Sequence, residues 1–491
     1  MNHALRRIAI LALVLFGLLL INVNYVQAFQ GASYVADPGN GRAFSQQFQY
    51  QRGSIVTADG KTIAASRPVK GVYNYQRFYP GGRLYAPVTG YDSIFGATGI
   101  EESENKLLAG TDPKLAVRNL VDLITGKRKK GATVALTINS AAQQAAYNAL
   151  KATGLPGAAV AIDPRTGAIL AMASYPTFNP NQYATFDGTQ LNKIDKQYRT
   201  SHSQPLLNRA LNATFPPGST FKIVTSSTAF SGGKYNPSTV VFAPTNLKLP
   251  NTSKQLINFD NEPCGSGRVP VLYAFTVSCN TVFGNIGMKL GGGALRAQAN
   301  RFGFNNPNLT IPVPVSQSNY PPVSDSALTA YSAIGQYSDT VTPLQEAMLS
   351  AAIANNGTLM KPYLVQKVTA PDLTPLESAQ STVLSQAVSQ SVASQVGQMM
   401  RSVVQNPIGT AHLSAGTGAA ASLNIAGKTG TAQNGINNVG LDDAVFTGFA
   451  PYGNPKIAIG VVVQGGGLGA DASAPIAVQT IQAYLAYLSK R

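Results

Sequence analysis

Strand patterns at both ends of the C-terminal two thirds of the chain constrain its fold more than any other feature. Apolar, glycine-bounded stretches predict five strands, two of them in a hairpin at 157–174 and the others at 424–433, 444–451 and 456–464. The residues between, to about Gly357, have mostly helical patterns, and 475–488 predicts an apolar helix. Strands from both ends of one domain, with helices between them, predict a single sheet covered by helices, an α+β fold.

The N-terminal third has a different, loop-rich pattern. A chain of 491 residues exceeds what one core usually supports, so we expect two domains beyond any anchor. Arg52–Ala64 predicts two short strands around Asp59-Gly60, and 96–110 predicts a glycine turn before a helix with an acidic start. A strand at 133–139 and a helix at 140–152 follow. The expected division is an anchor in 1–28, a mixed pedestal domain in 29–154 and a second domain in 155–491.

The N-terminus predicts a membrane anchor. Arg6 and Arg7 precede the apolar stretch Ile8–Ile21, and no further charged residue occurs until Asp37. A helix from residue 8 to residue 26 would span roughly 28 Å, close to the ~30 Å of a bilayer core. The alternative is a cleaved signal peptide with a cleavage site at 26–28. We favour an uncleaved anchor with Arg6 and Arg7 inside, which leaves the bulk of the protein outside the cytoplasm.

The net charge and the few cysteines limit the kinds of molecule that the protein is expected to bind. The net charge is +16, but no zinc-finger spacing or RNP-like motif accompanies it, so nucleic acid is not expected. We expect an envelope protein that faces anionic lipid or wall polymer, with the basic run 127–130 in a solvated turn. Two cysteines and three scattered histidines make no zinc site, and neither metal nor cofactor is expected. Outside the cytoplasm Cys264 and Cys279 could form a disulfide, or both could stay reduced.

The stretch T-F-P-P-G-S-T-F-K-I-V, residues 214–224, places Ser219 and Lys222 three residues apart among apolar neighbours. A helix that begins after Pro217-Gly218 would put both side chains on one face. Serine is a weak nucleophile unless a base takes its proton. Lysine can be that base only if burial or a second cation lowers its pKa from about 10.4 to about 7 or 8.

Two further motifs favour a catalytic role for Ser219 and Lys222. Ser278-Cys279-Asn280 lies at the end of an apolar helical run, and Lys428-Thr429-Gly430 lies on a predicted edge strand. The serine and asparagine could relay a proton, the lysine and threonine could hold a substrate carboxylate, and the glycine would let substrate approach the strand. Similar spacings elsewhere, at Ser103/Lys106, Ser231/Lys234 and Ser422/Asn424, lack companions, and the two lysine pairs should be solvated.

The order of the three motifs resembles that of the penicillin-recognising serine transferases and hydrolases. The similarity to class B penicillin-binding proteins, and most of all to the actinobacterial penicillin-binding protein A group, covers almost the whole chain. It is carried by P-P-G-S-T-F-K, V-S-C-N-T, G-K-T-G-T-A-Q and F-T-G-F-A-P, and in the pedestal by R-G-S-I-V-T-A-D-G-K and G-A-T-G-I-E. The resemblance implies a central antiparallel sheet covered by helices, a pedestal and a single anchor.

The resemblance also implies roles. Ser219 would be the acylated nucleophile and Lys222 its base, with Ser278 and Asn280 in the proton relay. Lys428, Thr429, Gly430 and Thr431 would bind the substrate, and backbone N–H groups of Ser219 and Thr431 would form the oxyanion hole. The expected reaction is peptidoglycan D,D-transpeptidation of stem peptides, inhibited by β-lactams. One departure is Tyr337, where many relatives have glycine, which puts the shape of one groove wall in doubt.

Alternative functions follow from the same residues. The resemblance implies a partner, a membrane glycan polymerase of the SEDS type that the pedestal would bind and activate, so a mainly scaffolding role is one alternative. A membrane-anchored β-lactam sensor or hydrolase is another, which the long pedestal disfavours. A P-loop at 427–429 fails because position 422 is serine. A Ser-His-Asp triad has only His202 and His412 to draw on, and Asp442-Asp443 is expected in a solvated turn.

Overall fold

The computed structural model describes residues 2–36, 47–433 and 441–490. Its C-terminal lobe is built on one antiparallel sheet in the order β17-β18-β19-β7-β8. The strands are β7 (Gly157–Ile162), β8 (Ile169–Tyr175), β17 (Ala426–Ala432), β18 (Asp443–Ala450) and β19 (Ile457–Val463). The chain therefore enters the sheet at both ends of the lobe, which confirms the predicted arrangement, and β17 is an edge strand.

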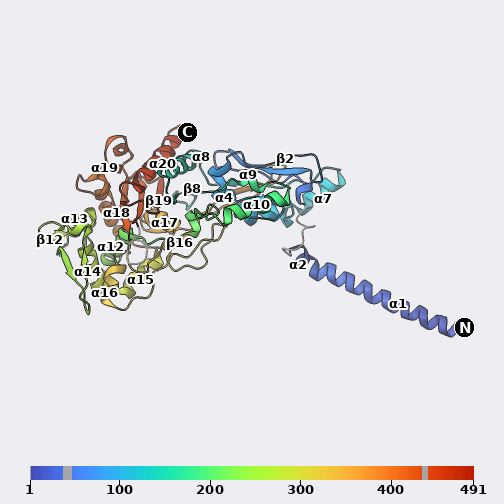
Figure 1. Cartoon of the computed structure of the whole chain (residues 1–491), viewed down its shortest axis with the longest axis horizontal. Coiled ribbons are helices and arrows are strands. Elements are labelled where there is room, and N and C mark those ends of the chain that lie inside the picture. Colours follow the sequence, from blue (N-terminus) through green and yellow to red (C-terminus); the bar gives the residue numbers. More distant parts are fainter. Residues whose placement is uncertain (1, 37–46, 434–440, 491) are drawn as a thin grey trace.

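Every residue of β18 and β19 is buried, which shows that both faces of this sheet are covered. α8 (Ser140–Thr153), α17 (Pro343–Ala354) and α20 (Ser473–Leu488) contact it directly (Figure 1). α17 approaches closely at Gly460, where an added Cβ would lie only 2.4 Å from the Ala347 nitrogen. The lobe between β8 and β17 is largely helical, with small two-stranded sheets among the helices: β9 (Val240–Phe242) with β12 (Arg268–Pro270), β10 (Asn246–Lys248) with β11 (Gln255–Ile257), and β13 (Thr358–Met360) with β16 (Val383–Gln386).

The pedestal sheet takes two of its six strands from a part of the sequence more than 200 residues further along the chain. Its order is β15-β14-β6-β1-β2-β3, with β1 (Ile55–Val56), β2 (Thr62–Pro68), β3 (Tyr75–Phe78) and β6 (Thr133–Leu136) from the pedestal and β14 (Val365–Thr369) and β15 (Pro375–Ser378) from beyond α17. β14 pairs antiparallel with β6. The turn around Asp59-Gly60 joins β1 and β2 as predicted, whereas the two later strands had no counterpart in the sequence analysis.

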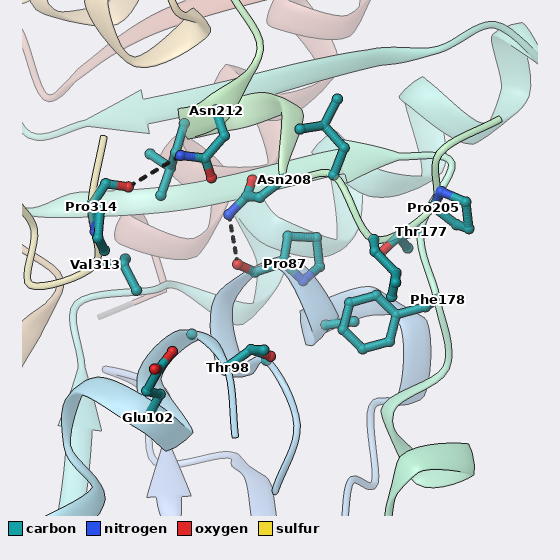
Figure 2. Close-up of a pocket in the computed structure, with 16 residues that line it drawn as sticks. Pro87, Thr98, Glu102, Thr177, Phe178, Pro205, Asn208, Asn212, Val313 and Pro314 are labelled. Carbon is teal, nitrogen blue, oxygen red and sulfur yellow. Dashed lines mark hydrogen bonds between the residues drawn. The ribbon is translucent and has the colours of Figure 1, made fainter. Parts of the chain in front are cut away.

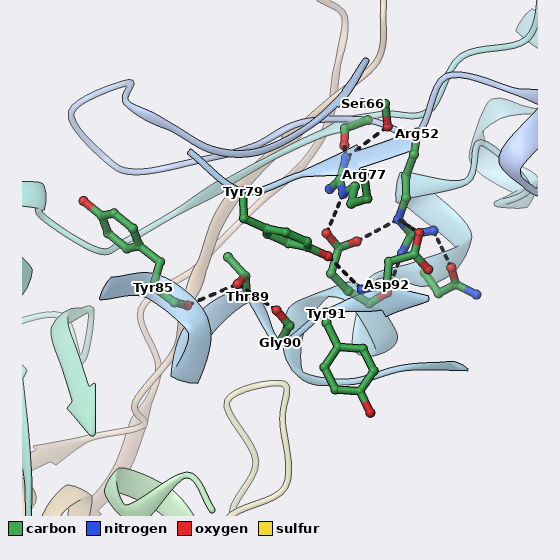
Figure 3. Close-up of polar contacts among 12 residues, drawn as sticks. Arg52, Ser66, Arg77, Tyr79, Tyr85, Thr89, Gly90, Tyr91 and Asp92 are labelled. Carbon is green, nitrogen blue, oxygen red and sulfur yellow. Dashed lines mark hydrogen bonds and ion pairs between the residues drawn. The ribbon is translucent and has the colours of Figure 1, made fainter. Parts of the chain in front are cut away.

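The acidic helix start in the pedestal serves a buried ionic cluster. α5 (Gly99–Ser103) begins after the predicted glycine turn, and its Glu101 is fully buried. Arg52 and Arg77 donate to the two Glu101 carboxylate oxygens at 2.7 and 2.6 Å (Figure 3). Asp92 lies 3.6 Å from Arg52, and its burial raises its pKa to about 6. Removing one partner from such a cluster strands a buried charge, which typically costs about 3–5 kcal/mol.

The pedestal and the C-terminal lobe meet at a cavity of about 290 Å³ (Figure 2). α4 (Ala86–Thr89) lines it from the pedestal and α11 (Arg209–Asn212) from the C-terminal lobe. The Asn208 amide donates to the Pro87 carbonyl at 2.8 Å, and the Asn212 amide donates to the Pro314 carbonyl at 3.3 Å. The first of these bonds ties the two lobes together beside the cavity.

The N-terminal helix projects from the pedestal end of the molecule (Figure 1). α1 (Asn2–Tyr25) continues through a π-helical turn (Val26–Gln30) into α2 (Gly31–Ala36). Within it, Leu5–Gln30 is long and apolar enough to cross a membrane, and its apolar side chains are exposed. These properties support the predicted single anchor.

One expectation about a turn is wrong. Asp443 was expected to be solvated, but it is the first residue of β18 and is buried. Its Oδ1 accepts a hydrogen bond from the Gly465 backbone N–H at 2.8 Å. The carboxylate thus satisfies the loop that follows β19, which the sequence pattern did not indicate.

Candidate active site

Ser219 lies in a single 3₁₀ turn, Gly218–Phe221, directly before α12 (Lys222–Ser231). The turn begins at Gly218, whose φ of +55° suits glycine, and the Gly218 N–H donates to the Gly335 carbonyl at 3.0 Å. A Cβ on Gly218 would lie 2.8 Å from the Thr431 carbonyl oxygen of β17. The nucleophile turn is therefore pressed against the edge strand that carries the Lys-Thr-Gly motif.

Gly430 meets the same contact from the other side. A Cβ at Gly430 would lie 2.8 Å from the Pro217 carbonyl oxygen and 3.0 Å from the Val445 Cβ. The structure therefore gives a second reason for glycine at this position, while the approach of substrate to it stays a prediction. The missing side chain makes room for the nucleophile turn.

Lys222 is fully buried and joins the first motif to the second. Its Nζ donates to the Ser278 carbonyl and to Asn280 Oδ1, both at 2.7 Å, and lies 3.2 Å from Ser278 Oγ. The aromatic face of Phe283 lies 5.6 Å away. Among the described residues, the hydrogen-bond partners of Lys222 Nζ are a carbonyl, a hydroxyl and an amide oxygen, none of which is charged. No carboxylate among them stabilises the ammonium form, which is the setting that a lysine base requires.

Ser278 connects all three motifs. It lies between α13 (Val271–Thr276) and α14 (Asn280–Leu290) with a φ of +60°, so its side chain leaves the chain at a sharp turn. Lys428 Nζ donates to Ser278 Oγ at 2.9 Å and to the Thr429 carbonyl at 3.0 Å. Lys222 Nζ and Lys428 Nζ thus both lie within hydrogen-bond distance of Ser278 Oγ, which places this hydroxyl between the two lysines.

The two lysines share a dry, positively charged environment. Burial lowers the pKa of Lys222 well below its ordinary value, and the charge of Lys428 lowers it further. Burial also lowers the pKa of Lys428, to about 7. Both effects disfavour the charged amine, so they favour the neutral form of Lys222 that can accept a proton.

These residues open onto a groove of about 780 Å³. Ser219, Ser278, Asn280, Thr429 and Thr431 all line it. The structure therefore brings these five predicted residues together at one groove, while Lys222 and Lys428 lie buried behind it and Gly430 is not among the residues that line it. The exposed pairs Ser103/Lys106 and Ser231/Lys234 lie elsewhere, as expected.

Three residues of the site were not found from the sequence. Thr410 Oγ1 lies 2.7 Å from Thr429 Oγ1, and Gln336 Nε2 donates to the Thr431 carbonyl at 3.0 Å. Thr410 follows a plain loop, so no signal marks it. Gln336 lies directly before Tyr337, the residue that departs from the family pattern, whose side chain is 44% exposed.

The third is Glu346, on α17 beneath the nucleophile turn. Its side chain is buried, and its Oε1 lies 2.8 Å from Thr220 Oγ1, which itself lies 2.8 Å from the Pro217 carbonyl. A hydroxyl has one proton, and the carbonyl can only accept it, so the arrangement is satisfied when the Glu346 carboxyl carries a proton. Burial raises the pKa of Glu346 to about 8, which agrees with a neutral acid at pH 7.

A disulfide joins Cys264 and Cys279 with a Cα–Cα distance of 6.0 Å. Cys279 lies between Ser278 and Asn280, so the bond fixes the second motif to the loop before α13.

Removing this disulfide should destabilise the protein. The bond closes a loop of 15 residues, and the chain-entropy model assigns such a loop about 3 kcal/mol of unfolding free energy. A Cys264→Ser/Cys279→Ser variant should lose about that much stability in denaturant unfolding, measured without reductant. With reductant, the wild type should approach the variant. Quantitative alkylation of both cysteines in the unreduced, denatured wild type would contradict the bond.

Two family models match the chain. Residues 157–482 match the penicillin binding protein transpeptidase domain, and 52–134 match the penicillin binding protein A dimerisation domain. The peptidoglycan D,D-transpeptidase PbpA of Mycolicibacterium smegmatis is 38% identical, and PbpA of Mycobacterium tuberculosis is 36% identical, each over 99% of both chains. A solved ceftriaxone acyl-enzyme complex of penicillin-binding protein A from M. tuberculosis superposes with a TM-score of 0.86 at 34% identity, covering 90% of this chain and 99% of that chain.

Proposed function

Since the chain belongs to the penicillin-binding protein transpeptidase family, we propose that it is a peptidoglycan D,D-transpeptidase that works through a serine acyl-enzyme. The observation that carries the proposal is the buried Lys222, which contacts both Ser278 and Asn280 and whose pKa is lowered by burial and by the charge of Lys428. A base of this kind is what a serine nucleophile needs.

The geometry supports a sequence of proton transfers. Lys222 takes the proton of Ser219 as its Oγ attacks the carbonyl carbon of the penultimate D-Ala of a stem peptide. The N–H groups of Ser219 and Thr431 hold the developing oxyanion, a contribution of about 3 kcal/mol per donor in comparable sites. The proton then reaches the leaving D-Ala amine through Ser278, whose oxygen contacts both lysines. An amine on a neighbouring stem peptide finally attacks the carbonyl carbon of the acyl-enzyme. The new C–N bond replaces the ester bond to Ser219 Oγ, and the proton that the amine loses returns through the same relay to Ser219 Oγ.

The edge strand binds the substrate. Thr429 and Thr431 line the groove on β17, and Lys428 lies behind them with its ammonium group near Ser278. We assign the terminal carboxylate of the stem peptide to these hydroxyls and to the positive charge of Lys428. A β-lactam carries a carboxylate and a reactive carbonyl at similar positions, so it acylates the same serine.

The remaining assignments concern the membrane. The anchor holds the protein with Arg6 and Arg7 inside and the catalytic lobe on the outer side. Figure 1 shows the pedestal between α1 and the C-terminal lobe, so with α1 in the bilayer the pedestal would separate the membrane from the catalytic lobe. We assign its partner as a SEDS-type membrane glycosyltransferase, which polymerises the glycan strands that this enzyme would cross-link.

Acylation by penicillin tests the proposal. Full-length protein treated with benzylpenicillin should gain one acyl group, and peptide mass mapping should place it on Ser219. Ser219→Ala should gain none, while the matched control Ser231→Ala, a serine with a lysine three residues later on the exposed surface, should label as the wild type does. Label on Ser231 or Ser103 would sink the assignment. Release of D-Ala from a pentapeptide with transfer to an added amine distinguishes a transpeptidase from a hydrolase or sensor.

A further inference from the structure

A short pedestal helix exposes a stripe of apolar side chains. α7 (Ala116–Ile124) carries Val117, Val121 and Ile124 on positions i, i+4 and i+7, which lie on one face of a helix. Their exposed fractions are 79%, 51% and 76%. Single exposed apolar residues are ordinary, but a helical row of three marks a surface that something covers.

Positive charge lies at the end of the same helix. α7 leads into the turn 125–130, whose side chains Lys127, Arg128 and Lys130 are exposed. Three acidic groups beside this helix are engaged in ion pairs: Arg118 contacts Asp122 and Asp372, and Lys114 binds Glu377. The face that α7 and its turn leave free is therefore apolar and cationic.

The chain's own connections place this face close to the anchor. The Gly131 N–H donates to the Gln51 carbonyl at 2.9 Å, and Lys129 Nζ lies 5.7 Å from the Tyr50 ring. Residues 47–51 are the first part of the pedestal that the structure describes after α2. Ten residues lie between Ala36 and Gln47, and the eleven Cα–Cα steps that join these two residues span at most about 40 Å, so Gln47 stays within that distance of the end of α2. The basic turn contacts residues 50 and 51, which follow closely after Gln47.

We propose that α7 and the turn 125–130 bind the surface of an anionic lipid bilayer, the valine–isoleucine row entering the interface and the basic side chains contacting lipid phosphates. Amphipathic helices with a cationic flank bind in this way, through buried apolar area together with attraction to anionic headgroups. The contact holds the pedestal at a fixed tilt to the membrane in addition to the covalent tether, and so sets the height of the active-site groove.

A single-site probe on the full-length protein tests this contact. Both native cysteines are in the disulfide, so Val121→Cys gives one site for an environment-sensitive fluorophore. The protein is reconstituted through its anchor into vesicles of phosphatidylcholine alone or with added phosphatidylglycerol. We expect blue-shifted emission, and several-fold weaker quenching by acrylamide, in the anionic vesicles only. The matched control is Leu413→Cys on α19 (His412–Ala415) of the C-terminal lobe, 87% exposed, whose label should not respond.

Two further variants separate charge from apolar contact. Lys127→Gln/Arg128→Gln should abolish the dependence on anionic lipid, and Val117→Ser/Ile124→Ser should restore quenching in the anionic vesicles. Penicillin labelling, which needs neither helix nor turn, reports that each variant is folded. A Val121 label that behaves like the Leu413 label in both vesicles overturns the proposal. So does protection that depends on protein concentration rather than lipid, which would indicate a second copy of the chain.

Discussion

Lys222→Ala should lower the rate of acylation by benzylpenicillin at pH 7 by about 10²–10⁴-fold, the usual contribution of a positioned general base. The lysine is the basic group that contacts both Ser278 and Asn280, and its lowered pKa makes it available as a base. The rate is read by stopped-flow or gel labelling of the acyl-enzyme over a range of penicillin concentrations.

Two variants control this result. Lys222→Arg keeps a positive charge that cannot be given up near pH 7, so it should be about as slow as the alanine variant. Lys234→Ala, which alters the exposed lysine of the spacing at Ser231, should react at the wild-type rate. An active arginine variant would mean that residue 222 acts through its charge alone and that another group takes the serine proton.

Lys428→Gln should slow acylation and also move its pH profile. Lys222 acts only when neutral, so the acidic limb of the profile follows its pKa. The charge of Lys428 lowers that pKa, after burial, and removing the charge should therefore raise it and move the limb to higher pH. A shift of one unit would reduce the rate about tenfold at a fixed pH on that limb.

The sign of the shift separates two roles of Lys428. The rate alone would fall in either case, because the substrate carboxylate also loses a partner. Lys428→Arg keeps the charge and should leave the acidic limb where it is in the wild type. If the limb of the glutamine variant also stays in place, Lys428 only binds substrate, and burial alone sets the pKa of Lys222.

The sequence predicted the parts of the fold that are local. A strand such as β19 is a continuous apolar run, and the turn that begins at Gly218 follows two prolines, so short windows of sequence suffice to predict them. The order of three short motifs then named the residues that meet around Ser278. Their meeting could be expected only through the family resemblance, since Lys222 and Lys428 are far apart in the chain.

The features that the sequence missed depend on distant packing. β14 alternates between buried and exposed residues without a clear pattern, and it becomes a strand by pairing with β6 on one side and β15 on the other. In the sequence Glu346 is an ordinary helical glutamate. Packing against distant elements, the nucleophile turn among them, buries its carboxyl group and raises its pKa to about 8. Asp443 was expected to be solvated for the same reason, because the loop that buries it lies beyond the next strand.

The late arrival of β14 affects how the chain matures during synthesis. β6 ends at Leu136, but the strand that covers its free edge begins at Val365. At roughly 5–20 residues per second, the ribosome needs on the order of ten to fifty seconds to supply it. Throughout that interval the nascent pedestal presents an open row of backbone donors and acceptors, the kind of edge on which chains aggregate. The pedestal sheet therefore cannot close until residue 369 has been synthesised, and truncations before that residue should yield insoluble pedestals.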